Sequence, residues 1–186
     1  MTEFTICSVQ EHDIKALADL RFYMWNDFYS DYVPENYLQK WTSIQQCHED
    51  QKEMVENCLK YSDNHHAIAA LDQDKLAGIC YMNKLQLTGN HPELENYDLE
   101  LDQLYIWPEY RRQGLGRKLL TAMLPWLQRK GYQSVCSWVF DQNEYKRFYP
   151  KHGAEFIKTV HNNYEGTILP LAVFGWPDFQ SLFDRS

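Results

Sequence analysis

A strand, a glycine-containing turn and a helix follow one another near the middle of the sequence, and this run most constrains the fold. Polar and apolar side chains alternate over residues 97–106, which predicts a strand with two different faces. Helical periodicity begins at Leu115 and stops before Gly131, which is placed as a C-cap glycine. At the junction, Gly114 and Gly116 lie where backbone N–H groups and the positive end of the helix dipole face a common point. We expect an anion site there, with glycine allowing the anion to approach the backbone and permitting positive φ.

Basic residues gather around the same helix start: Arg111, Arg112, Arg117 and Lys118. Cations at this end oppose the helix dipole unless an anion lies between them. A dinucleotide-binding fingerprint would need a small residue where Leu119 stands, and the Gly-Lys-Ser/Thr ending of a P-loop is absent. Both nucleotide interpretations are therefore weak.

Strand and helix patterns alternate along the rest of the chain. Strands are predicted at residues 4–9, 65–71, 76–87, 97–106, 134–140, 156–160 and 167–174, and helices at 11–28, 35–61 (one broken helix or two), 115–130 and 143–152. No repeat or linker interrupts this order, so residues 1–186 are expected to form a single domain. The predicted fold class is an α/β or α+β sandwich with a mixed sheet.

The composition fits a globular, acidic protein. Hydrophobic residues make up 44% of the chain, enough for a packed core. The net charge of -8 argues against a nucleic-acid partner and favours a cationic substrate over an anionic one. The five cysteines have no paired short spacing and are expected to be reduced structural thiols, with a catalytic cysteine as the alternative. Because no basic stretch followed by a long apolar run is present, we expect a cytoplasmic protein with no membrane partner.

Two segments carry a family resemblance. Residues 104–120 strongly resemble motif A of the GCN5-related N-acetyltransferase (GNAT) superfamily, whose Arg/Gln-x-x-Gly-x-Gly/Ala core falls on Arg111, Gly114 and Gly116. Residues 148–156 resemble motif B, the family's Phe-Tyr-x-x-x-Gly-Phe pattern. The resemblance implies a GNAT-like mixed, mostly antiparallel central sheet of about six to seven strands flanked by about four helices.

The resemblance also implies a site for acetyl-CoA. The backbone of three strand residues would pair with the pantetheine arm: Leu104, Tyr105 and Ile106. Arg111 leads the segment that would cradle the pyrophosphate: Arg112, Gln113, Gly114, Leu115, Gly116 and Arg117. The family's motif B asparagine falls on Gln142, with Asn143 beside it, so the pantetheine contact departs from the pattern.

Three side chains are candidates for catalysis of acyl transfer. Tyr149 matches the family's general acid; the alternative is a core tyrosine at helical spacing. Glu100 and Asp102 are expected on the same strand face as Leu104 and Ile106, where either could be the base. The alternatives are a solvated acidic face, a water as base, or an acid that binds a cationic acceptor.

The acceptor is expected to be the primary amine of a small molecule, such as a polyamine, an amino acid or an amino sugar. Two alternatives stay open: a protein or peptide N-acetyltransferase, and a catalytically inactive CoA-binding sensor. No histidine grouping indicates a metal. An aromatic-rich run over residues 23–41 is either core and lid or a wall of the acceptor pocket. Phe174, Trp176 and Phe179 offer apolar surface for a possible homodimer.

Overall fold

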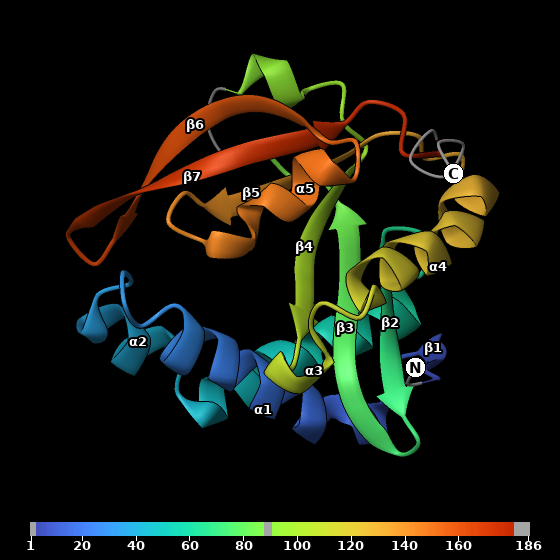
Figure 1. Ribbon diagram of the computed structural model, residues 1–186, viewed down its shortest axis with the longest axis horizontal. Helices are drawn as coiled ribbons and strands as arrows, with labels where there is room; N and C mark the ends of the chain where they lie inside the picture. Colours follow the sequence, from blue (N-terminus) through green and yellow to red (C-terminus); the bar gives the residue numbers. More distant parts are fainter. Residues whose placement is uncertain (1–2, 88–90, 181–186) are drawn as a thin grey trace.

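A computed structural model describes residues 3–87 and 91–180. Seven strands form one sheet in the order β1-β2-β3-β4-β5-β7-β6 (Figure 1). The strands are β1 Thr5–Ser8, β2 His65–Asp72, β3 Lys75–Lys84, β4 Leu99–Ile106, β5 Val135–Phe140, β6 Glu155–Tyr164 and β7 Thr167–Trp176. All neighbours are antiparallel except β4 and β5, which are parallel. The predicted mixed, mostly antiparallel sheet is confirmed.

Five helices cover the two faces of this sheet. They are α1 Ile14–Tyr23, α2 Glu35–Trp41, α3 Ile44–Lys60, α4 Leu115–Lys130 and the four-residue α5 Phe148–Lys151. A π-helical turn, Met24–Phe28, continues α1, and a 3-10 turn, Glu144–Arg147, leads into α5. α4 crosses in front of β2 and β3 while α3 lies behind them (Figure 1).

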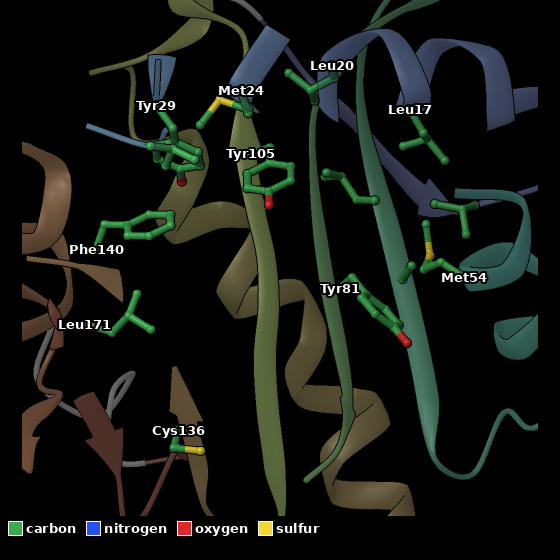
Figure 2. Close-up of a cluster of buried hydrophobic side chains, with 14 of the residues drawn as sticks. Leu17, Leu20, Met24, Tyr29, Met54, Tyr81, Tyr105, Cys136, Phe140 and Leu171 are labelled. Carbon is green, nitrogen blue, oxygen red and sulfur yellow. The ribbon is translucent and has the colours of Figure 1, made fainter. Parts of the chain in front are cut away.

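Each face of the sheet has its own apolar core. Leu17, Leu20, Met24 and Met54 pack toward the sheet from the side of α1 and α3, where Tyr105 and Tyr81 meet them (Figure 2). On the other face, leucines of α4 pack with Leu99, Leu101 and the C-terminal aromatics. We call these the α3 side and the α4 side.

The C-terminal aromatic residues are part of the core. Phe174, Trp176 and Phe179 are 6%, 1% and 0% exposed, packed on the α4 side. The prediction that they offer apolar surface for a homodimer is therefore wrong. β7 pairs with β5 and carries Phe174 and Trp176 inward, and Phe179 follows β7 and packs against Trp176, which the sequence pattern does not reveal.

Local signals explain where the helices begin and end. The predicted break within residues 35–61 falls at Ser43, whose side chain accepts a hydrogen bond from the Gln46 N–H at 3.1 Å, so α2 and α3 are separate helices. α4 has a left-handed glycine at both ends, Gly114 with φ 79° and Gly131 with φ 74°. Gly131 is the C-cap that the sequence predicts.

β4 and β5 pair over a short distance only. Their register joins Leu99 to Val135 and Glu100 to Cys136, and no later residue of β4 pairs with β5 in the described chain. Past Leu101, whose carbonyl accepts a hydrogen bond from Ser137 Oγ of β5, the edge of β4 that faces β5 is therefore open. This opening is the feature of the fold that positions the site.

A β-bulge interrupts β4 just past the last residue that pairs with β5. Leu101 pairs with Met82 on β3 and Gln103 with Tyr81, so Asp102 is the extra residue. The apolar side chains before and after the bulge consequently all face the α4 side: Leu99, Leu101, Leu104 and Ile106. By alternation Glu100 lies on the α3 side. The prediction that Glu100 and Asp102 share a face with Leu104 and Ile106 is wrong, because strict alternation over residues 97–106 assumes an unbulged strand.

Candidate active site

One large cleft is lined from both faces of the sheet. Its volume is about 1180 Å³, and its walls include Gly116 and Tyr149 from the α4 side and Arg21 and Asp50 from the α3 side. Glu100, next to the point where β4 and β5 separate, lines it as well. The separation of the two strands therefore connects the faces of the sheet through one continuous space.

The turn before α4 presents unpaired backbone donors. Arg112 and Gly114 have positive φ, 61° and 79°, and the first helical hydrogen bond runs from the Lys118 N–H to the Gly114 carbonyl at 3.1 Å. The N–H groups of Leu115, Gly116 and Arg117 therefore precede the first bond of the helix. Such a concave backbone at a positive helix end is suited to an anion.

The two glycines of this turn have different roles. A Cβ on Gly114 would meet nothing within 4 Å, so glycine is favoured there by the left-handed backbone alone. A Cβ on Gly116 would lie 3.0 Å from the Phe148 ring. Glycine at this position thus allows α5 to pack against α4, a reason that differs from the expected approach of an anion.

Basic side chains surround the turn, but they are not the same set that the sequence predicted. Arg112 and Arg117 line the cleft and are exposed. Arg147 and Lys151, which sequence reasoning missed, add positive charge from the segment leading into α5 and from α5 itself. Gln113 lies outside the cleft lining and donates through Nε2 to the Glu109 carbonyl at 2.8 Å.

Arg111 points away from the turn, toward the end of β4. Its Nε donates to the Ile106 carbonyl at 2.8 Å, and its guanidinium carbon lies 5.0 Å from the ring centroid of Phe28 and 5.2 Å from that of Tyr145. The side chain links β4, the turn after α1 and the turn before α5.

The open edge of β4 presents two peptide groups to the cleft. The Trp107 N–H bonds to the Ala77 carbonyl on β3, so by antiparallel alternation Tyr105 also faces β3. The peptide groups of Leu104 and Ile106 therefore face the gap. Their N–H and carbonyl groups could form hydrogen bonds with an extended chain. The exception is the Ile106 carbonyl, which already accepts the hydrogen bond from Arg111.

Gln142 and Asn143 differ in their positions. Gln142 is exposed and outside the lining of the large cleft. Asn143 lines the cleft, but its Oδ1 accepts a hydrogen bond from the Tyr145 N–H at 2.8 Å as the cap of the following turn. Only its Nδ2 remains as a donor for a ligand.

Tyr149 reaches the cleft from α5. Its ring stacks on Phe174 with centroids 5.4 Å apart, and the Ser137 side chain acts on its hydroxyl and lowers its pKa. Ser137 in turn donates to the Leu101 carbonyl on β4 at 2.9 Å, so Tyr149 sits beside the gap between β4 and β5. Burial raises the pKa of its phenol to about 12, which keeps the hydroxyl protonated at neutral pH.

Glu100 and Asp102 lie on the other side of the gap. Burial, aided by the charge of Asp102, raises the pKa of Glu100 to about 7, which suits a group that exchanges protons near neutral pH. The Asp102 side chain is exposed in the cleft, yet desolvation by the protein around it raises its pKa. The positive charge of the Arg21 guanidinium opposes this rise. The structure thus brings Tyr149 and the two acids into one cleft, with the phenol and Glu100 on opposite sides of the sheet.

The rest of the α3 side of the cleft comes from residues that sequence reasoning missed: Arg21, Trp25, Asp50, Glu53, Asn57, Tyr81, His91 and Trp138. Asp50, Glu53 and Asn57 stand at helical spacing on one face of α3. This helical spacing is the sequence signal from which these three residues could have been assigned to one wall of the cleft. Without the position of the gap, however, it could not be distinguished from a solvated helix face.

The five predicted thiols are free in the structure. All five cysteines are unpaired, and burial raises the pKa of Cys80 and Cys136, which argues against a reactive thiol at either. Within residues 3–87 and 91–180, no three His, Cys, Asp or Glu side chains are grouped to hold a metal ion. In the same part of the chain, no helix has the length and apolar character needed to cross a bilayer.

Comparison with known proteins decides the family. A model of the Acetyltransferase (GNAT) family matches residues 22–154, which is more than half of the chain. The chain belongs to the GNAT family of acetyltransferases. The resemblance seen in the two sequence motifs is thereby confirmed, and the chain is an acetyltransferase.

Relatives of the GNAT protein match over nearly its whole length. The uncharacterized N-acetyltransferase YuaI of Bacillus subtilis (strain 168) is 27% identical over 178 residues, covering 96% of this chain and 95% of YuaI. The PaiA N-acetyltransferase of Thermoplasma acidophilum, solved with coenzyme A, has a TM-score of 0.69 at 20% identity and covers 91% of this chain and 98% of its own. YncA of Salmonella typhimurium, solved with acetyl-CoA, has a TM-score of 0.70 at 15% identity, covering 94% and 93%.

Proposed function

We propose that this GNAT protein transfers an acetyl group from acetyl-CoA to the primary amine of a small molecule. The observation that carries the proposal is the cleft between β4 and β5, which has a protonated phenol, Tyr149, on one side and a carboxyl poised near neutrality, Glu100, on the other. Acyl transfer from a thioester to an amine needs these two functions on opposite sides of the reacting carbon.

The residues on the α4 side fit acetyl-CoA. The unpaired N–H groups of Leu115, Gly116 and Arg117, with the side chains of Arg112 and Arg117, would hold the pyrophosphate. The N–H and carbonyl of Leu104 on the open edge of β4 would pair with the amides of the pantetheine arm, which leaves the Ile106 N–H for the thioester. The relatives solved with coenzyme A and with acetyl-CoA support this assignment.

The proposed reaction uses this chain's groups in a fixed order. Glu100 accepts a proton from the ammonium form of the acceptor, directly or through water, and frees the nitrogen lone pair. The backbone N–H of Ile106 polarises the thioester carbonyl. As the nitrogen–carbon bond forms and the carbon–sulfur bond breaks, Tyr149 gives its proton to the sulfur. The newly acylated nitrogen then loses its extra proton, which passes to the Tyr149 phenolate and restores the phenol.

The roof of the acceptor end favours a small substrate over a folded protein. Glu165, at the tip of the β6–β7 hairpin, accepts hydrogen bonds from Lys40 Nζ at 3.0 Å and Trp41 Nε1 at 2.9 Å on α2. Next to it, the rings of Tyr37 and Tyr164 lie 4.9 Å apart, and the hairpin tip lies over α2 in Figure 1. These contacts tie α2 to the hairpin next to Tyr164, which lines the cleft, and we expect them to hinder the entry of a peptide there.

A thiol-release assay tests this proposal. The purified chain with acetyl-CoA is offered a panel of small amines and a panel of peptides with free N-terminal or lysine amines, and the products are checked by mass spectrometry. We expect thiol release and a singly acetylated product with small amines. Turnover of peptides alone would contradict the small acceptor. Tight CoA binding with no thiol release on any amine would support the inactive sensor instead.

A further inference from the structure

The large cleft has opposite charge at its two ends. On the α4 side its walls carry Arg112, Arg117, Arg147 and Lys151. On the α3 side they carry four acids, Asp50, Glu53, Glu100 and Asp102. Two guanidinium groups lie on this side as well, those of Arg21 and of Arg111, which is held against Phe28. The basic end fits the phosphates of the cosubstrate, so the acidic end is available to select the acceptor.

Most of the acidic charge is uncompensated. Asp50 is neutralised, because Arg21 Nη2 donates to one of its oxygens at 2.8 Å and Gln46 Nε2 donates to the other, also at 2.8 Å. Glu53, Glu100 and Asp102 have no ion pair in the part of the chain that the structure describes. Glu100 serves the proposed proton transfer. Glu53 and Asp102 therefore remain without an ion pair, and the Arg21 guanidinium offsets only part of the charge of Asp102.

A buried acceptor lies in the same wall. Gln103, directly after the Asp102 bulge, is 3% exposed and lines the cleft, yet its Oε1 has no hydrogen-bond partner among the described residues. A buried amide oxygen without a partner carries a free-energy cost that a ligand N–H group can remove. Trp25, Tyr81 and Trp138 complete the wall with aromatic faces, which attract cations.

We infer that the acceptor is an amine with a second cationic centre, a diamine or polyamine. Glu53 and Asp102 receive the second cation, and the Gln103 amide oxygen accepts one of its N–H groups. Glu100 is left for the amine that reacts. This inference rests on the proposed function and narrows its substrate class.

Arg21 does not make the pocket suitable for an amino acid. Its guanidinium is held by Asp50 and lies 5.8 Å from the centroid of the Trp25 ring. A substrate carboxylate on Arg21 would share the guanidinium with Asp50 and would lie close to Asp102, so three carboxylates would face one cation. The balance of charge thus disfavours an α-carboxylate.

Three matched amines separate these possibilities in the thiol-release assay. Cadaverine, n-pentylamine and lysine share a five-carbon amine chain; pentylamine lacks the second cation, and lysine adds a carboxylate. We expect kcat/KM for cadaverine to exceed that for pentylamine by about tenfold or more, and to exceed that for lysine as well. The preference should fall as salt is added, because screening weakens the selecting charges.

Two isosteric variants assign the preference to residues. Glu53→Gln and Asp102→Asn should each lower the cadaverine to pentylamine ratio by about threefold or more. Glu56→Gln is the matched control, because Glu56 is on the same helix but its side chain is 60% exposed and paired with Lys52. The control should leave the ratio unchanged.

Equal or better turnover of pentylamine would overturn the inference while leaving the proposed function intact. Preference for lysine would also overturn it and would identify Arg21 as a carboxylate site. If no amine releases thiol, the proposed function fails. Calorimetric binding of cadaverine and pentylamine to the CoA-bound protein then still tests the inference, which requires tighter binding of the diamine.

Discussion

At the scale of single residues, the proposed site depends on two proton-carrying groups, and burial raises the pKa of both. Burial keeps the phenol of Tyr149 protonated, with a pKa raised to about 12, and brings the pKa of Glu100 to about 7. In the proposed reaction the first therefore serves as the acid and the second as the base at neutral pH. Neither role is visible in the residue type alone.

Replacing Tyr149 with Phe should remove the acid and keep the packing. The ring remains stacked on Phe174, so the fold is expected to persist. We expect kcat to fall about 100-fold or more, with a smaller change in KM for acetyl-CoA, as measured by thiol release. Tyr132→Phe, at the far end of α4, removes a phenol that bonds to Asp63 and is the control. An unchanged kcat at every pH would show that Tyr149 is not the acid.

Glu100→Gln should affect activity and stability in opposite ways. Because the folded-state pKa of Glu100 is raised from 4.5 to about 7, the wild-type protein is destabilised as pH rises through 7, where the buried carboxyl must ionise. At pH 8 the variant should therefore be more stable by roughly 2 kcal/mol in the free energy of unfolding, while this gain should disappear below pH 4.5. Its kcat should fall about 100-fold.

Urea unfolding of both proteins at several pH values measures this difference, with the exposed acid Glu95→Gln as the control. A stability gain that is the same at acidic and alkaline pH would contradict the burial of an ionising carboxyl.

At the scale of elements, the contact between α4 and α5 depends on a missing side chain. Gly116→Ala would place a Cβ 3.0 Å from the Phe148 ring, so α5 must shift. We expect a loss of about 1–3 kcal/mol in stability and a higher KM for acetyl-CoA, because α5 carries Tyr149. Adding Phe148→Leu should recover most of both losses, and thermal unfolding with kinetics measures them. No coupling between the two substitutions would contradict this packing role.

Elements set by local sequence could be predicted, and those set by pairing could not. The strand, the turn and α4 were predictable because glycine caps and helical periodicity act within one segment. The bulge at Asp102 was not, since it depends on the register of β4 against β3, and it reversed the predicted face of Glu100. The acidic wall of α3 belongs to the site only because the gap between β4 and β5 opens opposite it.

At the scale of the whole molecule, the sheet separates two binding functions and joins them through one opening. α4 and α5 present backbone donors and basic side chains on one face, while α3 and β4 present acids, and the turn after α1 aromatic rings, on the other. Because β4 and β5 part after two paired residues, the chemistry can take place where the faces meet.

A crystal structure with a bisubstrate analogue, in which cadaverine is joined to CoA through an acetyl bridge, tests this arrangement most directly. We expect the pyrophosphate to lie on the turn of Arg112 and Gly114. The acetyl bridge should lie between Tyr149 and Glu100, and the free ammonium should lie against Glu53 and Asp102. An analogue that stays on one face of the sheet, or whose bridge lies away from Tyr149 and Glu100, would contradict it.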